Sequence, residues 1–149
     1  SYSNGEEGMS DDVAALRASK FGQLTVGSIM EREVQSGTKD TEAKMLASYM
    51  MDGFGSVPII DKSSKLVGIV SEFDILKALR KGKNLDEVIA GDIMTANPVS
   101  VTQDTNVLTL MDVLQNNHLI RVPVVDSTGK LIGIVARRDL LRGYLQTSG

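Results

Sequence analysis

Cysteine is absent from this sequence of 149 residues, and histidine occurs once, as His118. Without cysteine the chain has no disulfides, no thiolate metal ligands and no cysteine nucleophile. A single histidine supplies too few ligands for a transition-metal centre, so we expect no metal site and interpret His118 as an exposed turn residue. A chain without disulfides is also compatible with the cytosol, and we predict a cytoplasmic protein.

The sequence also lacks a strong charge of one sign and any long apolar run. The 16 Lys and Arg residues against 19 Asp and Glu residues give a formal net charge of −3, so no general attraction to nucleic acid or anionic lipid is expected. No apolar stretch approaches the roughly 18 residues of a membrane-spanning helix, and the first residues show no secretion-signal pattern. We therefore expect neither nucleic acid nor a membrane as a partner.

What the sequence does contain is an internal repeat. Residues 57–77 align without a gap with residues 122–142, and 10 of the 21 aligned pairs are identical. Further upstream, residues 27–30 (Gly-Ser-Ile-Met) match residues 91–94 (Gly-Asp-Ile-Met) at a spacing of 64 rather than 65. Such self-similarity indicates stacked copies of one structural unit. The chain is therefore predicted to contain two copies of a unit of about 60 residues.

The centre of each copy is predicted to form two strands followed by a helix. Residues 56–60 and 66–71 are continuous apolar runs, which is typical of strands that are buried on both faces and covered by helices. Residues 61–64 supply the turn between them. The other elements predicted for the first copy are a short strand near Val34, a helix over 41–52 and a helix over 72–80. Those predicted for the second copy are a strand over 99–101, a helix over 106–116, strands over 121–125 and 131–136, and a helix over 137–145.

These elements predict a mixed α/β (α+β) fold. Each copy has the order strand–helix–strand–strand–helix, and since neither covers its own sheet, the two units are expected to pack sheet to sheet about an approximate twofold axis. We expect a flexible N-terminal tail and a short helix over residues 1–23, a first repeat over 24–82 and a second repeat over 83–149. A helical link over 85–94 is expected to join the repeats.

The junction of strand and helix in each copy carries the residues best suited to chemistry. In the first copy, Ser71 is followed three residues later by Asp74 at a predicted helix start. One interpretation is a capping box, in which the serine and the acid satisfy backbone N–H groups. The other is a ligand site, where the helix start binds a phosphate and the acid accepts hydrogen bonds from ribose hydroxyls. In the second copy Ala136 replaces the serine while Asp139 remains, so a role beyond capping stays open.

These motifs resemble those of tandem cystathionine-β-synthase (CBS) domains, also called a Bateman module. The resemblance covers roughly residues 24–145 and rests on Ile-Met near the start of each copy, the hydrophobic-Pro-hydrophobic-hydrophobic-Asp segment, and Gly followed by Ser/Thr-x-x-Asp. It implies two clefts between the units that bind adenosine compounds such as AMP, ADP, ATP or S-adenosylmethionine. No cofactor is required beyond such a regulatory ligand.

The resemblance also implies which residues hold the ligand. The motif aspartate holds the ribose, the motif serine lies near ribose or phosphate, and the first strand and the hydrophobic-Pro segment enclose adenine. In the first site these positions are Val34, Ser56, Val57, Pro58, Ser71 and Asp74. In the second site they are Thr95, Pro98, Val99, Arg121, Val122, Pro123 and Asp139, with Arg137 and Arg138 available to phosphate.

Two departures from the family pattern distinguish the sites. Ala136 removes one hydroxyl contact from the second site, a loss on the order of 1 kcal/mol. The first copy has Glu72 and Phe73 where the second has Arg137 and Arg138, so Glu72 would repel a nearby phosphate. The hydroxyl is thus in one copy and the positive charge in the other, and arginines of one unit could serve a phosphate bound mainly by the other.

The resulting function hypothesis is a regulatory, non-enzymatic module that senses an adenosine compound and acts on an unidentified protein. The alternative is a ligand-free scaffold or interaction module in which the recurring aspartates only stabilise the fold. An enzyme is the least favoured hypothesis, because no nucleophile–base pair, metal cluster or phosphate-transfer loop is visible. The helices over 72–79 and 137–145 carry more apolar residues than one buried face needs, which with the family resemblance predicts a flat homodimer.

Overall fold

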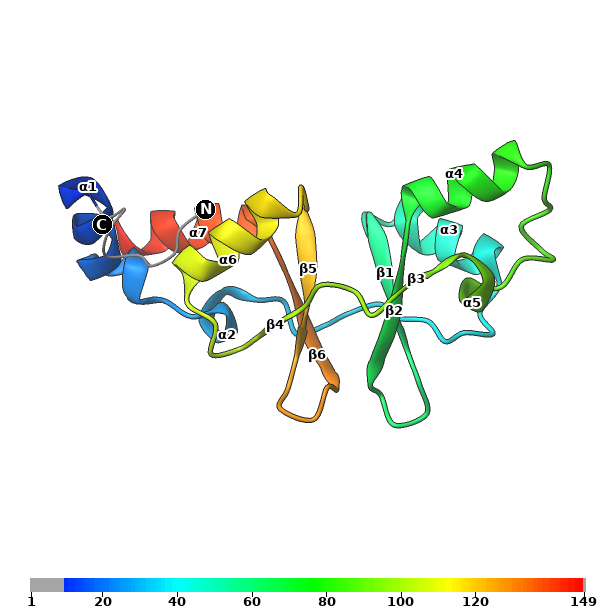
Figure 1. The fold of residues 1–149 in the computed structure, drawn as a ribbon, viewed down its shortest axis with the longest axis horizontal. Coiled ribbons are helices and arrows are strands. Elements are labelled where there is room, and N and C mark those ends of the chain that lie inside the picture. The colour runs from blue at the N-terminus through cyan, green and yellow to red at the C-terminus, as the bar shows by residue number, and fades with distance from the viewer. Residues whose placement is uncertain (1–9, 149) are drawn as a thin grey trace.

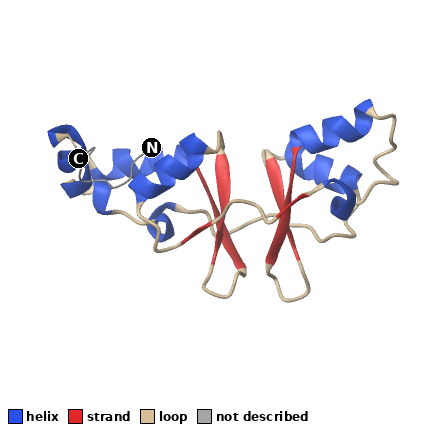
Figure 2. Cartoon of the chain, in the orientation of Figure 1, coloured by secondary structure: helices blue, strands red, loops and turns tan. Residues whose placement is uncertain are grey.

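The computed structural model describes residues 10–148 and shows two α/β units side by side, so the predicted fold class is confirmed (Figures 1 and 2). The predicted tail at residues 1–9 lies outside the described residues. In chain order the elements are α1 (Asp11–Ala18), the 3-10 helix η1 (Phe21–Gln23), α2 (Val26–Ile29), α3 (Ala43–Met51), β1 (Ser56–Ile60), β2 (Leu66–Ser71), α4 (Glu72–Arg80), α5 (Ala90–Ile93), β3 (Thr95–Ala96), β4 (Val101–Thr102), α6 (Val107–Asn116), β5 (Arg121–Val125), β6 (Leu131–Ala136) and α7 (Arg137–Thr147).

Each unit is built around an antiparallel hairpin, β1–β2 in the first and β5–β6 in the second. The two hairpins share their register and even their irregularity, which lies between Ile59 and Ile60 in one and between Val124 and Val125 in the other. Their turns meet in a reciprocal pair of hydrogen bonds, where the Leu66 N–H donates to a carbonyl of the second turn and the Leu131 N–H donates to one of the first (both 3.0 Å). This reciprocity is what the predicted twofold relation requires.

The turn of each hairpin explains why its aspartate recurs. In the first turn, Asp61 Oδ1 accepts hydrogen bonds from the N–H groups of Ser63 (2.8 Å) and Lys65 (2.9 Å). In the second turn, Asp126 accepts from the hydroxyl and N–H of Thr128 and from the Lys130 N–H. These bonds, the Thr128 hydroxyl first, lower the pKa of Asp126. Both aspartates therefore organise turns.

The short segment near the start of each repeat packs against the other unit. Glu31 joins the edge of β6, with its N–H donating to the Ile134 carbonyl (2.8 Å) and its carbonyl accepting from the Ile134 N–H (2.9 Å). In the same way, β3 pairs with β2 of the first unit. The core of the second unit consequently contains Phe21, Val26 and Met30. The boundaries at 24–82 and 83–149 stay predictions. They divide the sequence into its two repeats, whereas each packed core also contains a segment from outside its own repeat.

Glycine allows these crossing segments to lie directly on the hairpins. A methyl group added at Gly133 would come within 2.7 Å of the Glu31 carbonyl oxygen and 3.0 Å of the Met30 sulfur. One added at Gly68 would come within 2.3 Å of the Met94 sulfur. Glycine at these two positions therefore reflects close approach between chain segments.

We expect Gly133→Ala to destabilise the protein by about 1–3 kcal/mol, because the backbone at Glu31 has to move. Urea unfolding measures the change. Gly55→Ala is the control, since the atoms nearest to its methyl group would be those of the flexible Arg121 guanidinium, at 3.4 Å and beyond. Its effect is expected to stay within about 0.5 kcal/mol. Equal stability of Gly133→Ala and the unmodified protein would contradict the close packing.

Three predicted elements are wrong in detail. No strand forms near Val34; the first unit has only a single parallel bridge from Gly37 to Ile59, because glycine stands where the second unit has Val101 and begins β4. The strand predicted over 99–101 lies at Val101–Thr102. The link over 85–94 is helical only in α5, and its first part is a turn in which the Asn84 side chain accepts from the Asp86 N–H (2.9 Å).

Candidate functional site

The end of the first hairpin carries the serine and aspartate of the predicted site. In the register of β1 and β2, Ser56 pairs with Ser71, the residue that precedes α4. The Ser71 hydroxyl accepts from the Asp74 N–H (3.3 Å), and Asp74 Oδ2 accepts from the Ser71 N–H (2.8 Å) and hydroxyl (3.1 Å). The predicted capping box is confirmed. It uses only Oδ2, since no hydrogen bond to Asp74 Oδ1 is found among residues 10–148.

Asp139 holds the matching place in the second hairpin but has different partners. Its Oδ2 accepts from the Ala136 N–H (2.8 Å), which is half of a capping box because alanine has no side-chain acceptor. Its Oδ1 pairs with the Arg142 guanidinium, which also reaches the Glu31 carboxylate (3.2 Å). The Asp139 side chain is only 3% exposed, whereas Asp74 is partly exposed. The two acids are therefore equivalent in sequence but not in surroundings.

Arg121 connects the two units at the residues that lead into β1. It begins β5 in the second unit, yet its guanidinium donates to the Gly53 carbonyl of the first unit (3.4 Å). It also lies beside Gly55, directly before Ser56. A positive charge of the second unit is thus placed beside the start of β1, where Ser56 pairs with Ser71.

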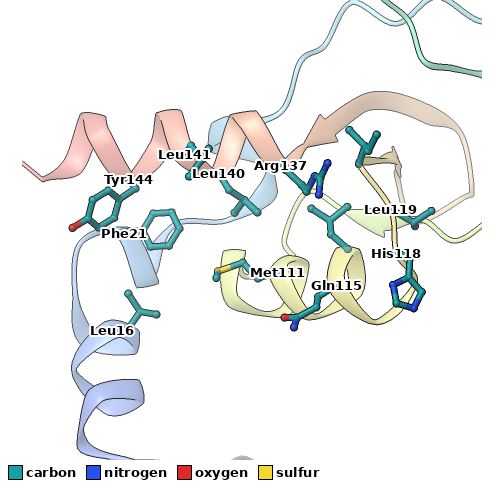
Figure 3. A pocket seen from close by; sticks show the side chains of 12 residues that line it. Leu16, Phe21, Met111, Gln115, His118, Leu119, Arg137, Leu140, Leu141 and Tyr144 are labelled. Atoms are coloured by element: carbon teal, nitrogen blue, oxygen red, sulfur yellow. The ribbon is translucent and has the colours of Figure 1, made fainter.

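The two arginines at the start of α7 lie on the surface. The Arg137 N–H donates to the Ile120 carbonyl (2.9 Å), and its side chain lines a groove on the helical face of the second unit (Figure 3). Arg138 is exposed, as are Glu72 and Phe73 at the matching positions of α4. Arg137 is therefore placed toward the helices rather than grouped with the acid of its own unit.

The apolar residues of the predicted sites are mostly structural. Val57, Pro58, Val122 and Pro123 are buried inside the two sheets, so only their backbone groups are available to a ligand. The remaining three predicted residues of the connecting segments, Val34, Pro98 and Val99, lie outside the strands and are partly or fully exposed.

The family resemblance implies that Thr95 belongs to the second site. In the structure it is part of β3 and pairs with Ile69 in β2 of the first unit. The cause is the exchange of segments between the units, which brings residues 95–96 to the edge of the first sheet. Thr95 therefore lies with the first unit.

Two features are absent from the described part of the chain. Between residues 10 and 148 no three His, Asp or Glu side chains gather closely enough to hold a metal ion. None of the helices in this range has the length and apolarity that a membrane span requires.

A model of the CBS domain matches residues 26–81 and 90–146. The chain belongs to the CBS domain family. This CBS pair is 37% identical over 121 residues to an uncharacterized protein of Methanopyrus kandleri. The alignment covers 80% of this chain and 62% of that protein. The chain thus spans less than two thirds of that relative.

Two solved structures of similar CBS pairs are complexes with adenosine compounds. CBSX2 of Arabidopsis thaliana in complex with AMP has a TM-score of 0.73 and 30% identity, with 85% of this chain and 99% of that chain covered. The CBS domain pair of protein MJ0100, in complex with 5′-methylthioadenosine and S-adenosyl-L-methionine, has a TM-score of 0.72 and 27% identity, with 82% and 96% covered. These ligands belong to those proteins.

Two grooves of this CBS pair lie on its helical faces. One groove of about 770 Å³ runs between α6, α7 and the α1–η1 segment and is lined largely by apolar side chains (Figure 3). Phe21 and Tyr144 meet there edge to face, with ring centroids 5.6 Å apart. A second groove of about 360 Å³ lies between α3 and α4. Phe73 (75% exposed) and Leu141 (67% exposed) are large apolar residues left in solvent beside them.

Arg142 and Glu31 were missed by the sequence analysis. Arg142 lies three residues after Asp139, a spacing that brings two side chains together on a helix, and this signal was available. Glu31 is 111 residues away from Arg142, and no local pattern links the two.

Proposed function

We propose that this CBS pair is a regulatory module that binds an adenosine compound at the Asp74 end of the first hairpin. The arrangement of Ser71, Asp74 and Arg121 is the observation that carries this proposal. Asp74 retains a carboxylate oxygen free of hydrogen bonds within the described chain, and an oxygen of this kind accepts from the vicinal hydroxyls of ribose. The AMP and S-adenosylmethionine complexes of similar CBS pairs support the same ligand class.

The proposed site draws on both units, which gives binding a way to act on the rest of the protein. Asp74 belongs to the first unit and Arg121 to the second. A ligand that contacts both residues favours one relative arrangement of the units over others. It can change the state of a partner protein only because it binds one arrangement more tightly than another. We propose that the partner is a second protein, that the module itself does no catalysis, and that it works in the cytosol.

A phosphate role for Arg121 can be tested with two ligands that differ only in phosphate. We expect Arg121→Ala to weaken AMP binding by about 10-fold or more, because hydrogen bonds to charged groups contribute about 1.5–3 kcal/mol. Adenosine binding should remain unchanged. Isothermal titration with AMP and adenosine measures both. Equal losses for the two ligands would assign Arg121 to the packing between the units instead.

The scaffold alternative has an observation of its own. Asp74 and Asp139 both accept hydrogen bonds from the backbone at a helix start, which is a sufficient structural reason for their recurrence. If no adenosine compound binds, capping is the whole role of these residues.

We further propose that two copies of the chain pair through their helical faces. Large apolar patches on a protein surface mark interaction sites, and the grooves between α3 and α4 and between α6 and α7 lie at equivalent places of the two units. A second copy of the same chain presents the same helices and can cover both grooves at once.

Introducing a charge on this face is expected to separate the dimer. Phe73→Glu or Leu141→Glu should weaken association by about 2 kcal/mol or more, since truncated hot-spot residues have effects of that size. Sedimentation equilibrium measures the constant, and Lys62→Glu in the first hairpin turn is the control. A monomeric unmodified protein, or a dimer unchanged by both substitutions, would rule out this interface.

A further inference from the structure

The two motif aspartates differ in what covers them. The Asp139 side chain is 3% exposed and holds the Arg142 guanidinium on Oδ1 and the Ala136 N–H on Oδ2. Asp74 is partly exposed and uses Oδ2 alone. A ligand that donates two hydroxyls therefore meets an available oxygen in the first unit and an occupied, covered carboxylate in the second.

The covering cation is held from a second side. The Arg142 guanidinium bridges Asp139 and Glu31, whose backbone is itself paired with Ile134 at the edge of β6. Arg142 thus ties α7 to the segment that crosses from the other unit. A buried carboxylate needs such a partner, because an unpaired charge in this position is strongly unfavourable.

The first unit lacks both parts of this arrangement. Lys77 stands at the position of Arg142, and within residues 10–148 it forms no ion pair with Asp74. Thr95 stands at the position of Glu31, so the crossing segment offers a hydroxyl where the second unit has a carboxylate. The bridge is consequently a property of the second unit alone among the described residues.

We infer that Arg142 closes the second cleft by occupying Asp139, so that the chain takes one adenosine compound, at Asp74, and takes a second only when Arg142 is released. This inference rests on the proposed function, since it concerns the number of sites for the same ligand class. Glu31 is a positioning residue in it, because it acts through its ion pair with Arg142.

The stoichiometry of binding tests the closure. In isothermal titration with AMP and with S-adenosylmethionine, the unmodified protein is expected to bind one molecule per chain and Arg142→Met two. Lys77→Met, the matched change in the first unit, should leave the value at one. Glu31→Gln loosens Arg142 without removing it and should add a weak second site. Two sites in the unmodified protein, or one site in both Arg142→Met and Glu31→Gln, would overturn the inference.

Carboxyl labelling gives a second readout that needs no ligand. Carbodiimide-driven coupling of an amine, followed by mass spectrometry, should modify Asp74 several-fold faster than Asp139 in the unmodified protein. In Arg142→Met and Glu31→Gln the Asp139 rate should rise, while the Asp74 rate stays constant. If no compound binds to any of the proteins, the sensing proposal fails, and equal labelling of the two aspartates in the unmodified protein would then separately overturn the closure by Arg142.

Discussion

Asp74→Ala is expected to abolish the rise in unfolding temperature that AMP gives the unmodified protein. A ligand at 100 times its dissociation constant adds about 2.7 kcal/mol of stability. At roughly 2–4 °C per kcal/mol for a chain of this size, the midpoint should rise by several degrees. Removing the carboxylate removes the proposed ribose acceptor, so the rise should disappear. Differential scanning fluorimetry with and without AMP measures it.

The substitution has a second effect that a control must separate. Asp74→Ala also removes the acceptor of the Ser71 N–H and is expected to lower stability by about 1 kcal/mol without ligand. Asp139→Ala removes the equivalent acceptor from Ala136 but does not alter Ser71, Asp74 or Arg121. It should lower the midpoint and retain the rise with AMP. An unchanged rise in Asp74→Ala would remove this residue from the site.

Leu46→Ala and Leu110→Ala are each expected to destabilise the whole module by about 2–5 kcal/mol, because both leucines are fully buried in their cores. They stand at equivalent places in α3 and α6. Each core contains a segment delivered from across the pair, such as Phe21 and Val26 in the second and Val88 in the first. A cavity in either unit should therefore lower the temperature of one unfolding transition that the two units share.

Calorimetry distinguishes common from separate unfolding. The expected result is one unfolding transition, at a lower temperature in both variants than in the unmodified protein. Two transitions, of which each variant moves only one, would show that the exchanged segments do not couple the units. Asp112→Ala, at an exposed position of α6 outside the lining of the groove, is the control and should change stability by less than about 1 kcal/mol.

The sequence repeat was sufficient to predict the hairpins. The bounds of β1, β2, β5 and β6 agree with the prediction because each strand is a continuous apolar run followed by a turn or a helix start. The short strands could not be predicted in this way. A pairing of two residues such as β4 depends on its neighbour β5 rather than on its own composition. The sequence also could not predict that the segments at 27–30 and 91–94 each pack against the other unit. Both copies carry the same motif, and nothing in it indicates the unit with which it packs.

The candidate site shows the same division. Ser71, Asp74 and Asp139 were found because their spacing has a local meaning at a helix start. Arg121 was found through the family resemblance, while its contact with Gly53 depends on how the units face each other. The bridge from Asp139 through Arg142 to Glu31 joins distant parts of the chain, and only the folded structure brings them together.

The central claim, that this CBS pair binds an adenosine compound, is tested most directly by titrating the unmodified protein. Isothermal titration with AMP, ADP, ATP and S-adenosylmethionine is the measurement. Saturable binding of at least one of them in the micromolar range is the predicted result, which corresponds to about −8 kcal/mol at 1 μM. No heat and no saturation with any of the four at millimolar concentration would contradict the claim and leave the scaffold function.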